Sequence, residues 1–155
     1  MKQTLKETKF EYYNRLADNI RATYKAAKKE GNDQLMGVAH MLMEEHNKVI
    51  HDSETQNFQT LLTSYEVAKQ IGNDYIDFDR PLSDEDCEDM VRIMKGNKQE
   101  YFTFSSTWSS AIRMAWAFER AGCKLEGLVR IKTIGQIPFS DEYVTAPAYL
   151  FKIIY

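Results

Sequence analysis

The sequence predicts an α+β fold, or the related α/β fold, because helical and strand patterns occupy different parts of the chain. Apolar residues recur at helical spacing before residue 74, whereas residues 74–155 alternate short strand patterns with helical ones. We therefore expect an N-terminal three-helix layer packed on a mixed sheet of about four strands with two crossover helices. The same boundary separates an N-terminal helical region, 1–73, from a β-α-β-α-β-β domain, 74–155, within one compact unit.

Three helices are expected before residue 74, over residues 6–29, 35–51 and 55–71. The first and third end in the same pattern, Y-x-x-A-K-x-x-G-N-D, which begins at Tyr24 and again at Tyr65. The glycine of each copy is expected to end its helix, since glycine adopts a positive φ without a Cβ penalty. We interpret both copies as efficient helix C-termini, with a helix-pair repeat as the alternative.

The stretch 99–133 predicts a β–α–β unit. Residues 100–105 are rich in aromatic and β-branched side chains and predict a strand. Ser105, Ser106 and Thr107 offer side-chain oxygens that cap a following helix, and Gly122 is expected to end it. Alternation from residue 125 to residue 132 then predicts the next strand.

The other elements complete the expected sheet. Residues 75–79 alternate as a short strand, and residues 83–95 predict a helix that begins with a capping serine. One glycine and two prolines predict a loop over 134–147, and 148–155 predicts a closing strand. We expect the first three strands to run largely parallel and the last to run antiparallel.

Composition excludes several classes of protein. A net charge of −3 and a pI near 5.7 argue against a non-specific nucleic-acid binder, which is usually basic. Cys87 and Cys123 form neither a disulfide framework nor a metal-ligand spacing. The longest apolar run falls short of the ~18 residues of a transmembrane helix, and no apolar leader opens the chain. We therefore expect a cytoplasmic protein with no membrane association and no cofactor.

Charge is distributed unevenly along the chain. Residues 2–29 are basic and residues 74–89 are acidic, and solvated helix faces are the simplest interpretation. An acidic surface that imitates a phosphate backbone is the alternative. His40, His46 and His51 do not reach one common point on a helix, so no metal site is expected.

The serine- and threonine-rich turn is the first candidate site. A strand-to-helix turn with hydroxyls is where anions bind in α/β proteins, and its phosphate-binding residues would be Ser105, Ser106, Thr107 and Ser109. The turn lacks the glycines of a dinucleotide or Walker loop. Helix capping with a solvated first turn is therefore the simpler interpretation.

The following helix is the second candidate site. Apolar residues cover most of its surface, and we place Trp116 in the core. A partner-binding surface would use the aromatic and basic side chains of Trp108, Arg113, Arg120, Lys124 and Arg130, because tryptophan and arginine dominate interface hot spots.

The segments YFTFSSTWSS (101–110), AWAF (115–118) and AGCKLEGLV (121–129) resemble an uncharacterised family of small α/β proteins. Members of that family are carried by phages and other mobile elements of Firmicute-type bacteria. The resemblance covers Thr60 to Tyr155, and its motif carries no assigned chemistry, so it implies no catalytic residue. It implies a mobile-element context, in which small acidic proteins often bind and inhibit host proteins such as CRISPR nucleases.

We accordingly expect a non-enzymatic protein-binding module of a mobile genetic element, of the anti-CRISPR type. Its partner would be a host protein, such as a nucleic-acid-processing effector complex. The alternative is a small enzyme that recognises phosphate or nucleic acid through the serine- and threonine-rich turn. Direct nucleic-acid binding is not favoured, and a homodimer is a further alternative.

Overall fold

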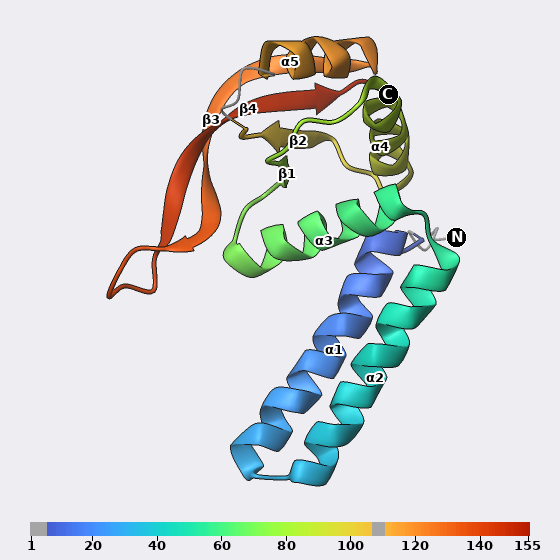
Figure 1. Cartoon of the computed structure of the whole chain (residues 1–155), viewed down its shortest axis with the longest axis vertical. Helices are drawn as coiled ribbons and strands as arrows, with labels where there is room; N and C mark the ends of the chain where they lie inside the picture. Colours follow the sequence, from blue (N-terminus) through green and yellow to red (C-terminus); the bar gives the residue numbers. More distant parts are fainter. Residues whose placement is uncertain (1–5, 107–110) are drawn as a thin grey trace, which may run out of the picture. The chain divides into compact units, whose positions relative to one another are not determined.

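The computed structural model describes residues 6–106 and 111–155, which contain five helices and one mixed four-stranded sheet (Figure 1). The helices are α1 (Lys9–Glu30), α2 (Asp33–Ser53), α3 (Gln56–Ile71), α4 (Asp84–Gly96) and α5 (Ala111–Arg120). The strands are β1 (Ile76–Phe78), β2 (Tyr101–Phe104), β3 (Cys123–Gln136) and β4 (Tyr143–Ile153). This order confirms the α+β class. No helix in the described ranges has both the length and the apolarity to cross a bilayer.

The chain divides into two compact units, and the boundary lies within α3, between Gln59 and Thr60. The sequence places the boundary later, between residues 73 and 74. The difference arises because the C-terminal part of α3 belongs to the sheet-containing unit: Ala68 and Ile71 are buried there and line a cavity together with residues of β1 and β3.

The first unit contains a pair of long helices with an aromatic and ionic cluster at one end. The Thr8 hydroxyl caps α1 in a reciprocal capping box with Glu11. Phe10 packs against Phe58 with ring centroids 5.2 Å apart, and the Tyr13 hydroxyl donates to Glu54 at 2.9 Å. Burial, followed by the hydrogen bond to Glu54, raises the pKa of Tyr13 to about 12.

The repeated G-N-D sequence ends two helices as predicted but uses its asparagine in two ways. Gly31 (φ 68°) follows α1 and Gly72 (φ 81°) follows α3, both in the left-handed conformation. Asn32 caps α2 by accepting from the Leu35 amide at 3.1 Å. Asn73 instead reaches strand β3, where it accepts from the Lys132 amide at 2.9 Å and donates to the Lys132 carbonyl at 2.8 Å.

The sheet has the order β1-β2-β4-β3. Strands β1 and β2 pair in parallel, and β4 pairs antiparallel with both β2 and β3. The first three strands therefore share one direction and the last opposes them, which confirms the expected directions. The closing strand lies inside the sheet, between β2 and β3.

The expected loop over 134–147 is wrong, because most of it is strand. Strands β3 and β4 form a long hairpin that extends past β1 and β2, with its turn at 137–142 (Figure 1). Pro147 is tolerated in β4 because it pairs with Arg130. The backbone N–H and C=O of Lys132 bond to Asn73 and therefore point away from β4. In an antiparallel pair, residues two apart on a strand point their backbone groups the same way, so Arg130 and Pro147 also form a non-hydrogen-bonded pair. The missing proline N–H therefore leaves this pairing intact.

Five phenylalanines form the core on one face of the sheet. Phe118 of α5 lies 4.8–6.1 Å, between ring centroids, from four rings of β1, β2 and β4: Phe78, Phe102, Phe104 and Phe151. Phe102 and Phe151 also stack on each other at 5.3 Å. Aromatic side chains bury large apolar areas, so this cluster holds α5 on the sheet.

We expect Phe118→Ala to lower the free energy of unfolding by about 3–5 kcal/mol, because it removes the ring that all four neighbours contact. Urea unfolding followed by circular dichroism measures this loss. Trp116→Ala, on the exposed side of the same helix, is the matched control and should change stability by about 0.5 kcal/mol or less. Equal losses in the two variants would contradict the assignment of the core.

Candidate functional site

The exposed side of α5 carries Ile112, Trp116 and Arg120, which we call the α5 outer face. Trp116 is 58% exposed and Ile112 is 84% exposed, so the expectation that Trp116 lies in the core is wrong. The helical period explains the correction. Met114 and Phe118, four residues apart, share the buried side, and Trp116 lies midway between them on the opposite side. The Arg120 guanidinium lies 4.9 Å from the Trp116 ring centroid, a cation–π contact.

Of the other predicted partner-binding residues, Arg113 borders this face, one turn before Trp116 and with a half-exposed side chain, whereas Lys124 and Arg130 belong to strand β3. Arg113 donates to the Leu82 carbonyl at 3.0 Å and pairs with Asp84 at 3.5 Å, which ties α5 to the start of α4. Lys124 of β3 lies opposite Lys152 of β4 in the strand register. Strand alternation places its side chain on the face of the sheet that α5 does not cover. Arg130 donates to Thr145 at 3.1 Å on the hairpin. Trp108 lies outside the described residues.

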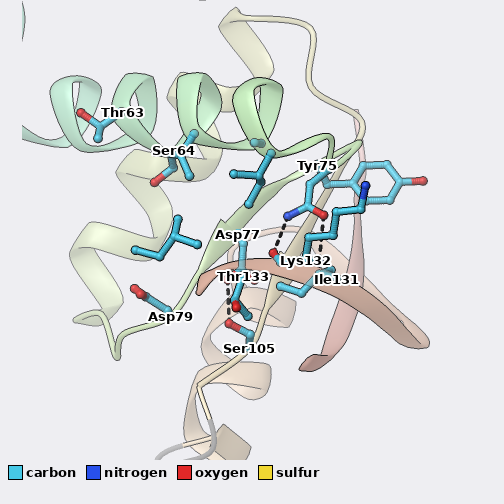
Figure 2. A pocket seen from close by; sticks show the side chains of 14 residues that line it. Thr63, Ser64, Tyr75, Asp77, Asp79, Ser105, Ile131, Lys132 and Thr133 are labelled. Carbon is cyan, nitrogen blue, oxygen red and sulfur yellow. Dashed lines mark hydrogen bonds between the residues drawn. The ribbon is translucent and has the colours of Figure 1, made fainter. Parts of the chain in front are cut away.

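A second candidate site is a cavity on the other face of the sheet, within the unit 60–155. It has a volume of about 270 Å³ and lies between α3 and residues of β1 and β3 (Figure 2). Its apolar lining comes from α3 and from β3: Val67, Ala68, Ile71, Ile131 and Ile134. Its polar lining includes Thr63, Ser64, Tyr75, Asp77, Asp79, Ser105 and Lys132.

Asp77 is the central polar group of this cavity. Strand alternation turns Asp77 away from the phenylalanine core that its neighbours Ile76 and Phe78 enter. The parallel pairing of β1 with β2 sets Asp77 opposite Thr103. Both carboxylate oxygens of Asp77 accept hydrogen bonds, one from the Thr103 hydroxyl at 2.7 Å and one from the Ser105 hydroxyl at 2.6 Å.

The environment of Asp77 acts on its pKa in opposing directions. Burial raises the pKa above its usual value, the hydrogen bonds from Ser105 and Thr103 lower it, and nearby Asp79 raises it, with a net upward shift. A raised pKa in the folded state means that ionisation of Asp77 opposes folding. This carboxyl therefore favours the folded state most below its unfolded pKa, and that contribution is lost as the pH rises through the folded pKa.

The structure brings one predicted phosphate-binding residue to this cavity. Ser105 lines it, but its hydroxyl proton is directed at Asp77, and an anion there would meet that carboxylate. Ser106 is buried, and its Oγ has no hydrogen-bond partner among the described residues. Thr107 and Ser109 lie outside the described residues. The arrangement around Ser105 therefore suits a cation better than an anion.

The two cysteines, both buried, lie outside the two candidate sites. Burial raises the pKa of Cys87 to about 11 and that of Cys123 to about 12, so both are thiols at neutral pH. In the described part of the chain, no group of three or more His, Cys, Asp or Glu side chains could hold a metal ion.

Sequence reasoning missed Asp77 as a site residue. The alternating run Tyr75–Asp79 predicts its strand, and the Ser/Thr run after Tyr101 predicts hydroxyls. Their meeting depends on the parallel register of β1 and β2, which no local pattern indicates.

We expect Thr103→Val to raise the pKa of Asp77 further, because it removes a donor that stabilises the ionised carboxylate at constant side-chain shape. At pH 7 the free energy of unfolding should fall by about 1–3 kcal/mol, with a smaller loss at acidic pH, where Asp77 is neutral. Carboxyl ¹³C NMR titration and urea unfolding at both pH values measure these effects.

Thr145→Val is the matched control, since Thr145 lies on the hairpin and does not line the cavity. It should leave the pKa of Asp77 unchanged. An unshifted Asp77 in Thr103→Val would indicate that the hydroxyl donates to the more distant Ile76 carbonyl instead.

Comparison with known proteins places the second unit in a family. No curated protein and no solved structure matches the chain. The family model of DUF7698, a domain of unknown function, matches residues 60–153, which is more than half of the chain and nearly the whole second unit. The match leaves out α1 and α2 and contains both candidate sites. The chain therefore belongs to the DUF7698 family.

Proposed function

We propose that this protein is a non-enzymatic protein-binding module and that the α5 outer face is its contact surface. The observation that carries the proposal is the exposed Trp116, with Ile112 one turn before it and Arg120 one turn after it. Large aromatic side chains and arginine provide most of the binding energy at protein interfaces.

The cation–π contact between Arg120 and Trp116 supports this role energetically. A side chain that is already held in one place loses less conformational entropy when a partner covers it. The contact also combines an apolar ring with a positive charge, which fits a partner surface that has an apolar pocket beside acidic groups.

The more specific form of the proposal is that the partner is a host defence nuclease and that the chain inhibits it, as anti-CRISPR proteins do. This form, with its origin in a phage or other mobile element, rests on the sequence resemblance alone. The alternative, a phosphate- or nucleic-acid-recognising enzyme, has less support because the Ser105 hydroxyl is directed at a carboxylate.

We expect Trp116→Ala to weaken binding to the partner by roughly 30-fold or more, the loss of about 2 kcal/mol that defines an interface hot spot. Tagged wild-type chain captures the partner from bacterial lysate, and the dissociation constant is then measured with the purified partner. Tyr24→Ala is the matched control, because Tyr24 is an exposed aromatic residue of α1, outside the α5 outer face. It should bind like the wild type.

Equal binding of Trp116→Ala and the wild type would place the interface elsewhere. Recovery of RNA or DNA that is released steeply as salt rises, with no protein partner, would favour the alternative. The inhibitor form has its own test: the purified chain should reduce the partner's cleavage of nucleic acid, and Trp116→Ala should not.

A further inference from the structure

The Asp77 carboxylate lines a cavity without a countercharge. No lysine or arginine in the described ranges forms a salt bridge with it: Arg80 pairs with the neighbouring Asp79 at 3.9 Å instead, and the charged group that acts on Asp77 is that second carboxylate. Lys132 lines the same cavity, but its Nζ lies over Gly72, 3.2 Å from the position that a Cβ there would occupy. Figure 2 shows the Lys132 chain extending toward Tyr75, away from Asp77. A half-buried carboxylate without a cation is costly unless a ligand supplies one.

The Asp77 carboxylate also keeps hydrogen-bonding capacity toward the cavity. An ionised carboxylate accepts about four hydrogen bonds, and the hydroxyls of Thr103 and Ser105 supply two. Both of those donors lie at or just after β2, on one side of Asp77. The hydrogen bonds from these two hydroxyls fix the orientation of the Asp77 carboxylate. The lone pairs of its oxygens that accept no hydrogen bond are therefore held in place beside the cavity.

Polar residues are numerous in the rest of the lining, but apolar atoms provide most of its exposed surface. Val67 and Ile71 present aliphatic side chains from α3, and Ile131 presents one from β3. The volume of about 270 Å³ lies just under the ~300–1,000 Å³ of typical small-molecule sites. A ligand of this cavity would therefore be small, with a hydrophobic body and one cationic end.

We propose that the cavity binds an alkylammonium group, whose nitrogen donates to Asp77 and whose alkyl chain packs against Val67, Ile71 and Ile131. The same chemistry is found in a free aliphatic amine and in the lysine side chain of another protein. This inference does not rest on the α5 outer face, which lies on the other side of the sheet.

The test is a titration of the ¹⁵N-labelled chain followed by NMR. n-Butylammonium is the probe, and n-butanol, which has a similar shape without the charge, is its matched control. The expected result is saturable shifts at residues 63–71 and 131–134 with n-butylammonium, and binding of n-butanol that is weaker by roughly tenfold or more. Equal binding of the two probes, or no saturable shift with n-butylammonium, would overturn the proposal without any variant being needed.

Asp77→Asn then tests the residue itself. It should weaken n-butylammonium binding by roughly tenfold or more, whereas Asp141→Asn, in the hairpin turn outside this cavity, should bind like the wild type. Undiminished binding in Asp77→Asn would overturn the assignment. A third arm uses Nα-acetyl-lysine N-methylamide: tighter binding than n-butylammonium identifies a protein lysine as the natural group, and weaker binding identifies a free amine.

Discussion

The contact of Phe118 with four aromatic rings is the interaction on which the second unit depends. These rings come from β1, β2 and β4, so one side chain of α5 joins three strands that are distant in sequence. Because the cluster occupies one face of the sheet, strand alternation assigns every intervening residue to the other face. The apolar core and the Asp77 cavity are therefore two consequences of the same alternation. Helix periodicity acts in the same way on α5, where burial of Met114 and Phe118 exposes Ile112 and Trp116.

This arrangement gives the family domain two surfaces with different chemistry. The α5 outer face is exposed and combines apolar, aromatic and cationic side chains, which suits a protein partner. The cavity is concave and aliphatic with one oriented carboxylate, which suits a small cation. Both belong to residues 60–155, where the DUF7698 match lies, whereas the helical pair α1 and α2 lies outside that match. The activities proposed for the two surfaces are independent, since no residue is shared between them.

Most of the secondary structure was predictable because its signals are local. The glycines at 31, 72 and 122 end helices with positive φ, and Ser83 caps α4, as their residue types indicate. The hairpin was missed because Gly135, Pro138 and Pro147 are also typical of loops. A proline is compatible with a strand only at particular pairing positions, and the sequence does not reveal the pairing. The prediction that Trp116 is buried was wrong, although helical periodicity places Trp116 opposite Met114 and Phe118, which are the buried residues.

The sequence by itself therefore determined the class of fold, the order of the elements and the directions of the strands, because propensity, capping and periodicity act over a few residues. Only the tertiary structure decided which residues meet. The register of β1 on β2 brought Asp77 to Thr103 and Ser105, and the insertion of β4 placed Phe151 beside Phe102. It also decided that Asn73 binds a distant strand while Asn32, in the same local sequence, caps a helix. Such contacts join residues that are far apart along the chain, and a local pattern carries no information about them.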